Sequence, residues 1–281
     1  MEEVVGADWR RYWRAADRPL EAMHAGFRRH VYDRHSHDAY SFGVTERGAQ
    51  AFTCRGAART SAAGMVMAFN PDEPHDGHTA TADGFVYRIV YMGPGLVADV
   101  LGDAAGRPVG APLVADPVVR DPAVADAVWR LHAALLDGAD PLVRDERLTA
   151  AVLALTGRAA TRPAAAAPDA GRRAVMRAVA RARDALADPA RPDRDLDLDA
   201  LAGVAGCSRF ALYRAFRQVY GMAPSAYRRQ LRLRTARDLL RHDTPIAEAA
   251  TAAGFADQAH LTRWFVRCYG VTPATYAHAT G

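Results

Sequence analysis

The sequence contains no lysine and few cysteines. Arginine supplies every permanently basic side chain of the 281 residues, which we ascribe to coding bias and not to a property of a site. The cysteines are Cys54, Cys207 and Cys268. Their odd number and the lack of a C-x-x-C spacing fit a reduced cytosol, where disulfides are rare. We therefore expect a cytoplasmic protein.

Long hydrophobic runs are absent as well. No stretch approaches the roughly 18 apolar residues that a membrane span needs. The N-terminal stretch MEEVVGADWRRYWRA is charged and aromatic, without the apolar segment of a secretory signal. We expect no membrane partner. The sequence also shows no nucleophile–base constellation, phosphate-binding loop or paired carboxylates that would favour an enzyme.

Acidic and basic residues are distributed unevenly over a chain that is long enough for two domains. The formal net charge is +4. From Arg172 onward the chain has 18 arginines and 10 acidic residues, whereas 18 arginines and 22 acidic residues precede that position. The C-terminal part is therefore basic, which is typical of a surface that binds nucleic-acid phosphates.

An internal repeat lies in this basic part. Residues 208–221 (SRFALYRAFRQVYG) and 257–270 (DQAHLTRWFVRCYG) align without a gap at an offset of 49 positions, which indicates a duplicated supersecondary unit. Each copy begins with a helix-capping residue, Ser208 or Asp257, and continues with apolar residues at i, i+4 and i+8. A short helical segment and a glycine precede each copy. The sequence therefore predicts two helix-turn-helix motifs.

The outward faces of the two capped helices carry residues that can contact DNA. Arginine and glutamine can bond base edges in the major groove, and threonine or an aromatic ring can contact thymine methyl groups. The candidates are Arg209, Tyr213, Arg214, Arg217, Gln258, His260, Thr262, Arg263 and Arg267. The alternative is a plain bundle of helical hairpins with a solvated arginine face, which two copies with the same polar face disfavour.

About a hundred C-terminal residues resemble the AraC/XylS-type transcription regulators. The matching residues are Ala202, Ser208, Leu212, Arg214, Phe216, Gly221, Pro224, Ala249, Gly254, Phe255, Leu261, Arg263, Phe265, Gly270, Pro273 and Tyr276. In that family one long helix joins two helix-turn-helix motifs, and residues 225–241 fit this helix. The resemblance implies that these residues face the bases: Phe210, Tyr213, Arg214, Gln258, Thr262 and Arg263. Ala259 departs from the polar residue often found at its position.

The resemblance also implies partners. Double-stranded promoter DNA, a small-molecule effector, a second copy of the chain in a homodimer and RNA polymerase are the expected ones. AraC-type regulators often carry a cupin-like effector domain before the helix-turn-helix motifs, so the same domain is expected here.

The N-terminal part has β character from about residue 20 to residue 92. Runs at 43–46, 50–54, 65–69 and 85–92 are rich in strand-forming residues, and glycines such as Gly48 mark the predicted breaks between them. Short strands at this spacing suggest a small antiparallel barrel or jelly roll. Residues 1–18, by contrast, predict an amphipathic helix because two tryptophans lie four positions apart.

Three histidines cluster within this predicted barrel. His35 and His37 form an H-x-H pair and His75 follows later, which resembles the metal-binding pattern of cupins. Three imidazoles can bind a divalent metal. The glutamate that cupins place four or five residues after the second histidine is replaced by Ser41 or Phe42. We expect no cofactor, with a divalent metal on the three histidines as the alternative to a polar lining of a metal-free barrel.

Six side chains are candidates for contact with an effector inside the barrel: Tyr40, Phe42, Phe52, Met67, Tyr87 and Arg88. For each of them the alternative is ordinary barrel core. Two apolar stripes then predict helices within residues 121–136 and 141–160. In the family this region commonly forms the dimer interface. Residues 161–171 are rich in alanine and proline without an amphipathic pattern, so they are the predicted linker.

Together these patterns predict a multidomain α+β protein. Residues 1–160 form a cupin-like β-barrel with accessory helices for effector binding and dimerisation, and residues 172–281 form an all-α domain with two helix-turn-helix motifs joined by a long helix. The predicted function is a sequence-specific transcription regulator controlled by a small-molecule effector, and not an enzyme. Two alternatives stay open: a metal-dependent cupin enzyme fused to a DNA-binding domain, and a regulator whose barrel only dimerises or meets a protein partner.

Overall fold

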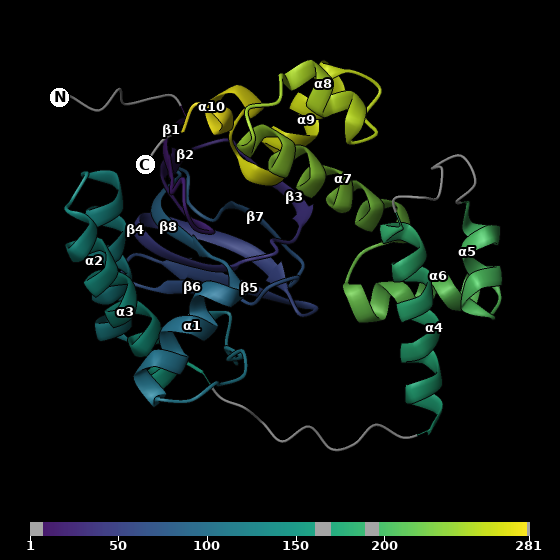
Figure 1. Cartoon of the computed structure of the whole chain (residues 1–281), viewed down its shortest axis with the longest axis horizontal. Helices are drawn as coiled ribbons and strands as arrows, with labels where there is room; N and C mark the ends of the chain where they lie inside the picture. Colours follow the sequence, from purple (N-terminus) through teal and green to yellow (C-terminus); the bar gives the residue numbers. More distant parts are fainter. Residues whose placement is uncertain (1–7, 161–169, 189–196, 280–281) are drawn as a thin grey trace. The chain divides into compact units, whose positions relative to one another are not determined.

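The computed structural model describes residues 8–160, 170–188 and 197–279. The backbone divides into two compact units, which are sheet-rich in the N-terminal part and helical in the C-terminal part (Figure 1). The predicted multidomain α+β fold class is therefore confirmed.

The strands of the N-terminal unit form two antiparallel sheets that share one strand. The first sheet has the order β1-β2-β8-β4-β6-β9, and in the second sheet β4 pairs with β5 and β7, and β7 pairs with β3. The strands are β1 (Trp9–Arg14), β2 (Leu20–Phe27), β3 (Tyr32–His35), β4 (Tyr40–Cys54), β5 (Ala57–Ala62), β6 (Val66–Phe69), β7 (His75–Thr79), β8 (Phe85–Met92) and β9 (Val118–Val119).

The shared strand β4 bends at a glycine instead of ending there. Its pairing with β8 shifts register between Thr45 and Arg47, and Gly48 follows with φ of 70°. A Cβ atom at Gly48 would collide with the carbonyl oxygen of Gly84, so no other residue fits this backbone without a shift. The predicted break at Gly48 is therefore wrong, because a β-bulge lets one strand continue from the first sheet into the second.

The helix predicted for residues 1–18 is also wrong in its described part. Residues 9–14 form β1, which pairs antiparallel with β2 along its whole length. Positions i and i+4 share a face in a strand as well as in a helix, so the spacing of Trp9 and Trp13 fits both. The aromatic residues of β1 favour a strand, and the free edge of β2 provides its partner.

Three helices cover the outer face of the first sheet (Figure 1): α1 (Pro94–Ala105), α2 (Pro122–Leu136) and α3 (Pro141–Arg158). Asp121 and Asp140 cap α2 and α3 by accepting hydrogen bonds from backbone N–H groups of the first turn, and a proline follows each of them. The predicted apolar stripes of α2 and α3 are confirmed, since Leu131, Leu135 and Val152 are buried in one core with the sheet.

The helices of the C-terminal part of the chain are α4 (Ala170–Ala187), α5 (Leu198–Ala205), α6 (Arg209–Tyr220), α7 (Pro224–Arg241), α8 (Ile246–Ala252), α9 (Gln258–Tyr269) and α10 (Pro273–Ala277). One core joins α4 to α7 through buried residues such as Val179, Leu212 and Tyr227. Helix α4 begins two residues before the predicted domain start and thus inside the predicted linker 161–171; residues 161–169 lie outside the described residues.

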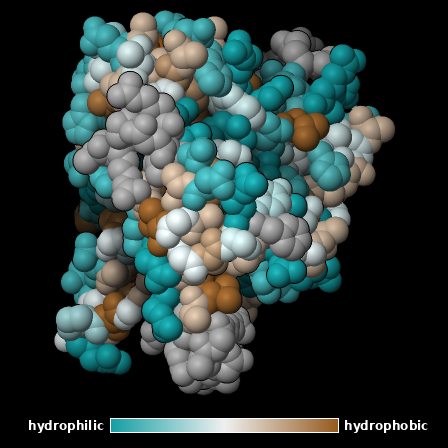
Figure 2. Space-filling model, turned by 90° about the vertical axis from the view of Figure 1, so that its right-hand side faces the viewer, coloured by the Kyte–Doolittle hydropathy of each residue, from teal (hydrophilic) through white to brown (hydrophobic). Residues whose placement is uncertain are grey.

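The described surface is predominantly polar on the face that Figure 2 presents, where hydrophobic residues lie scattered and do not gather into a broad area. Among the described helices, none combines the length and the apolar composition that crossing a membrane requires.

Candidate functional site

Two helical pairs, α5–α6 and α8–α9, form the first and second helix-turn-helix motifs. Helix α5 ends at Gly206, whose φ of 70° is left-handed, and the turn after α8 contains Gly254 with φ of 80°. The next helix begins with a side-chain cap in both cases. The Ser208 hydroxyl accepts from the Ala211 N–H at 3.3 Å, and the Asp257 carboxylate accepts from the His260 N–H at 2.6 Å.

The repeated apolar residues fix the rotation of both capped helices. Leu212 and Phe216 of α6 are fully buried, and so are Leu261 and Phe265, which occupy the same positions in α9. One buried leucine and one buried phenylalanine ring hold one side of each helix against its own core. The opposite sides of α6 and α9 are therefore presented outward in the same way.

The outward face of α6 carries four of the candidate DNA-binding residues in exposed positions. They are Arg209, Tyr213, Arg214 and Arg217. Arg209 forms an ion pair of 3.1 Å with Asp199 of α5, and the Arg217 guanidinium lies 5.7 Å from the centre of the Tyr213 ring. The side chain of Phe210, a further candidate, lies outside the described residues.

The outward face of α9 is built differently. Gln258, Arg263 and Arg267 are exposed. Thr262 is half-buried and its hydroxyl donates to the Gln258 carbonyl at 2.8 Å. His260 is half-buried and turned toward its own turn, where its Nδ1 accepts from the Ala256 N–H at 3.4 Å. A residue predicted to face DNA thus also helps to hold the turn.

A small cavity lies between the two sheets of the N-terminal unit. It holds about 30 Å³, which suits an ion or one or two waters, whereas pockets for drug-sized ligands hold roughly 300–1,000 Å³. The lining residues are Tyr32, His35, His37, Gln50, Phe52, Met67, Phe69, His75, Asp76, Gly77, Tyr87, Ile89 and Tyr91.

Three of the six predicted effector residues line this cavity, and the inward placement of the other three is wrong. Phe52, Met67 and Tyr87 line it. Tyr40 and Phe42 are buried in the core beneath α2 and α3, and Arg88 also points to that side. The cause is strand alternation: neighbouring residues of one strand point to opposite faces, and helices cover the outer face of the first sheet.

Arg88 belongs to a polar network between the first sheet and α2. Its Nε donates to Glu46 at 3.0 Å, and its guanidinium carbon lies 4.2 Å from the centre of the Trp129 ring. A second Arg88 nitrogen lies 3.4 Å from Nδ1 of His132. The His132 Nε2 donates to the Met23 carbonyl at 3.1 Å. The network links α2 with three strands, β2, β4 and β8.

Burial first, and the Arg88 charge second, lower the pKa of His132 to about 3. His132 is fully buried and therefore neutral at ordinary pH. The sequence prediction missed this histidine. Its signal was a polar residue on the apolar stripe of α2, between Leu131 and Leu135.

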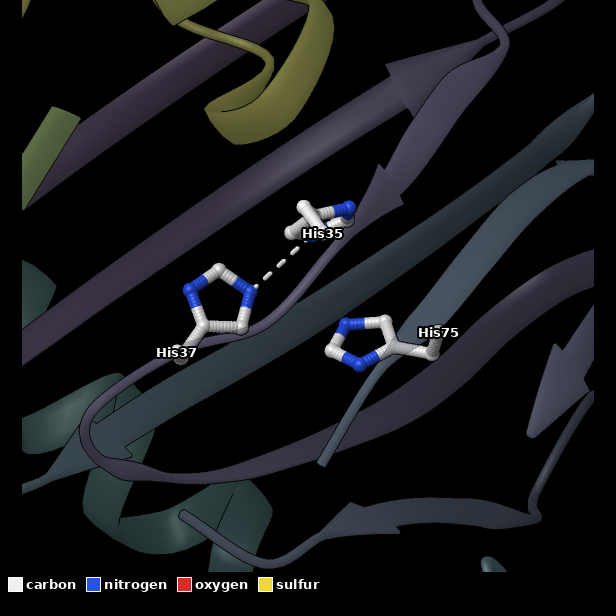
Figure 3. Close-up of side chains that lie close together, drawn as sticks. All are labelled: His35, His37 and His75. Carbon is white, nitrogen blue, oxygen red and sulfur yellow. Dashed lines mark hydrogen bonds between the residues drawn. The ribbon is translucent and has the colours of Figure 1, made fainter. Parts of the chain in front are cut away.

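His35, His37 and His75, here called the histidine triad, converge on the cavity. His35 ends β3, His37 follows in the next loop, and His75 begins β7. All three are buried, and their rings lie together in Figure 3. One potential ligand atom from each lies within 4.8 Å of the others, and the Nε2 atoms of His35 and His37 are 3.2 Å apart.

Backbone carbonyls orient two rings of the histidine triad. The Nδ1 of His35 donates to the Asp33 carbonyl at 2.7 Å, and the Nδ1 of His75 donates to the Glu73 carbonyl at 2.9 Å. The Phe69 ring also stacks on His75 at 3.8 Å. Burial lowers the pKa of His75 to about 4 and holds the pKa of His35 well below its usual value. Both rings are therefore neutral and keep their Nε2 lone pairs.

The histidine triad fits a metal by its donors. Metal-binding histidines usually donate their second ring nitrogen to a carbonyl or carboxylate, and two members of this triad do so. Ligands at roughly 2.0–2.1 Å from a tetrahedral ion lie roughly 3.3 Å apart, close to the His35–His37 separation.

Both parts of the chain match models of known protein families. Residues 19–152 match the model of the AraC-like ligand binding domain, and residues 201–279 match a helix-turn-helix domain model. The chain belongs to the AraC-type regulators, in which a ligand-binding domain precedes a helix-turn-helix domain. The resemblance stated from the sequence is thereby confirmed.

Curated relatives match the chain over a shorter stretch. The HTH-type transcriptional regulator MtrA of Neisseria gonorrhoeae is 31% identical over 93 residues, which is 32% of this chain and 31% of MtrA. The HTH-type transcriptional activator RhaR of Escherichia coli strain K12 is 37% identical over 82 residues, or 29% of each chain. The chain thus spans about a third of the length of these relatives.

Solved structures resemble the chain over nearly all of its length. An apo form of a ToxT variant from Vibrio cholerae has a TM-score of 0.56 at 10% identity, with 95% of this chain and 99% of ToxT covered. Wild-type ToxT with a bound unsaturated fatty acid has a TM-score of 0.51 at 11% identity and covers 99% of this chain and 98% of ToxT. At such identities the likeness shows the fold alone.

Proposed function

We propose that this chain is a transcription regulator that binds specific double-stranded DNA through its two helix-turn-helix motifs and is controlled by a ligand in its N-terminal unit. The observation that carries the proposal is the repeated build of α6 and α9. Each helix has a capped start, one side fixed in a core, and exposed arginines on the other. A plain bundle of helical hairpins with a solvated arginine face would not require the same cap, buried side and arginine-bearing side in both helices.

Phosphate and base contacts are divided among the exposed residues in this proposal. Arg214 and Arg263, at equivalent positions of α6 and α9, read base edges in two segments of the major groove. Arg217 neutralises phosphate. Helix α7 joins the two motifs and spans about 27 Å at 1.5 Å per residue. A single chain can then address two groove segments about one turn of DNA, roughly 34 Å, apart.

Selection of duplexes from a random DNA pool by the full-length protein tests this proposal. We expect one enriched motif with two blocks about a turn apart. Arg214→Ala and Arg263→Ala should each weaken binding by about 1–3 kcal/mol and relax base choice in one block only. Arg217→Ala should weaken all sequences alike and flatten the dependence of affinity on salt.

Arg59→Ala is the matched control, because Arg59 is an exposed arginine of β5 in the N-terminal unit. It should leave the selected motif and its affinity unchanged. If Arg214→Ala and Arg263→Ala behave like this control, the two helices do not read DNA as proposed.

Control by a ligand and dimerisation complete the proposal. The family model for the N-terminal unit is a ligand-binding domain, and one of the similar ToxT structures holds a bound unsaturated fatty acid. Helix α3 exposes Leu142 and Leu153 to 67% and 42%, which suits a contact with a second copy. A monomer in sedimentation equilibrium would contradict the dimer. RNA polymerase is the proposed protein partner, and the cytoplasm the proposed location.

The proposed role is regulation and not catalysis. The curated relatives described above are named as transcriptional regulators. A cupin enzyme fused to DNA-binding helices would instead need a reacting substrate at the histidine triad. A cavity of about 30 Å³ provides little room for one.

A further inference from the structure

We propose that a pocket on the helix-covered side of the first sheet binds a small apolar α-amino acid. The inference deepens the proposed function, on which it rests only for the role of this ligand in control. The cavity between the two sheets holds about 30 Å³, whereas this pocket holds about 130 Å³. The two share no lining residue. The pocket is therefore a separate site.

The pocket lies where the turn between β1 and β2 meets the start of α3. Its lining residues are Trp13, Ala15, Asp17, Arg18, Leu20, Leu135, Pro141, Arg144 and Asp145. They come from β1, from the following turn and the start of β2, from the end of α2, and from the start of α3. The whole pocket therefore belongs to the N-terminal unit.

The first feature of the pocket is an apolar wall. Trp13, Leu20 and Leu135 are buried and belong to the core that the first sheet shares with α2 and α3. An apolar cavity of roughly 150 Å³ takes up a benzene ring. The volume of about 130 Å³ therefore has room for a branched chain of the size of a leucine side chain. Burial of such a chain against this wall favours binding.

The second feature is an unused hydrogen-bond donor. The Nε of Arg144 is buried and has no hydrogen-bond partner among the described residues. The Arg144 guanidinium carbon lies 5.8 Å from the centre of the Trp13 ring, and thus next to the apolar wall. A buried donor without an acceptor is unfavourable, and a guanidinium can bind a carboxylate through two parallel N–H···O bonds. The pocket therefore suits a ligand carboxylate at Arg144.

The third feature is an excess of negative charge at the mouth of the pocket. Asp17 and Asp145 share Arg18, with N–O distances of 3.2 and 2.6 Å, and both carboxylates are exposed. One guanidinium compensates only one of the two negative charges, so the mouth attracts an ammonium group. An apolar side chain, a carboxylate and an ammonium group together make an apolar α-amino acid.

The pocket adjoins the surface proposed for dimerisation. Leu142 and Val143 directly precede Arg144 in α3, and they are 67% and 37% exposed. A ligand bound to Arg144 contacts the helix that carries this surface. It can control dimerisation by preferring one arrangement of α3 over another, since a ligand shifts an equilibrium only through such a preference.

Isothermal titration calorimetry of the full-length protein with L-leucine tests the inference without DNA. We expect one site per chain with a dissociation constant of about 1 mM or below. Isocaproate, which is leucine without the ammonium group, should bind about threefold more weakly. Isoamylamine, which is leucine without the carboxylate, should bind at least roughly tenfold more weakly. Glycine, which lacks the apolar side chain, should show no measurable binding.

Two variants and one control place the ligand in the pocket. Arg144→Gln should weaken leucine binding at least roughly tenfold. Asp145→Asn should remove the preference for leucine over isocaproate while isocaproate still binds. A loss of folding, which circular dichroism detects, would weaken both ligands alike. Arg147→Gln is the matched control, because Arg147 lies on the same helix but does not line the pocket, and it should bind leucine like the wild type.

No measurable binding of leucine would overturn the inference, because the pocket would then hold water alone. Isocaproate binding as tight as that of leucine, or undiminished leucine binding by folded Arg144→Gln, would overturn it as well. A chain that binds leucine through Arg144 yet selects no DNA would support the inference and refute the proposed function. Selection of DNA without leucine binding would overturn the amino-acid site alone.

Discussion

The buried His132 makes the stability of the N-terminal unit sensitive to mild acid. An unfolded histidine titrates near 6.5, whereas the pKa of His132 in the fold is about 3. Between these values the unfolded chain binds a proton that the folded chain excludes, so stability falls as pH falls through this window. From pH 6.5 to pH 5 the difference for this one group is about 2 kcal/mol.

The charged groups around His132 do not reverse this fall in stability with falling pH. Arg88 faces its Nδ1 and disfavours a second positive charge, and His24 lies close, with 5.8 Å between ring centres. Glu46 pairs with Arg88 and with His24, so its charge is already compensated. The Met23 carbonyl accepts from the Nε2 and favours the charged form only weakly against burial.

His132→Gln is the informative variant, because the glutamine amide can still donate to the Met23 carbonyl but does not titrate. Urea unfolding between pH 6.5 and pH 5, followed by tryptophan fluorescence, measures the effect. Three of the four tryptophans, Trp9, Trp13 and Trp129, lie in the N-terminal unit. The wild type should lose about 2 kcal/mol more than the variant over this range. Other buried histidines titrate equally in both proteins and cancel, so parallel losses would refute the reasoning.

Two further predictions concern packing and backbone. Leu212→Ala and Leu261→Ala remove equivalent, fully buried side chains of α6 and α9, and each should cost about 2–5 kcal/mol in denaturant unfolding. Leu113→Ala, at an exposed leucine, should be near neutral. A loss confined to one motif would contradict their equivalence. Gly48→Ala places a Cβ against the Gly84 carbonyl at positive φ and should cost more than about 1 kcal/mol, whereas Gly56→Ala, at positive φ in open space, tests the backbone cost alone. Equal losses at Gly48 and Gly56 would show that the Gly84 contact is unimportant.

The helix-turn-helix motifs could be predicted from the sequence because their signals are local. The capping residue, the glycine turn and the apolar positions spaced for a helix all fall within about 25 residues of each motif. The internal repeat contains the same signals a second time. Ser208 and Asp257 cap their helices as expected. The side-chain roles on the outward faces were less predictable, since the engagement of His260 with its own turn depends on a backbone that pattern reading does not give.

The N-terminal unit was harder to predict because its pairings are long-range. The spacing of Trp9 and Trp13 fits a helix and a strand equally, and only the pairing of β1 with β2 decides between them. Likewise, the sequence does not show which face of their strand Tyr40 and Phe42 occupy. In the structure they lie on the face that α2 and α3 cover. His75 lies on a different strand from His35, and the three histidines come together only in the folded sheets. The H-x-H pair in the sequence suggested this proximity only through its resemblance to cupins.

The duplication of α6 and α9 also has an evolutionary consequence. The fully buried leucine and phenylalanine positions are the same in the two helices, and so are the exposed Arg214 and Arg263. Other outward positions differ, with Tyr213 and Gln218 in one copy opposite Thr262 and Arg267 in the other. Exposed substitutions usually change stability by less than about 0.5 kcal/mol. Each copy can therefore acquire a new DNA preference without endangering folding and independently of the other, so the two halves of a recognition site are free to diverge one at a time.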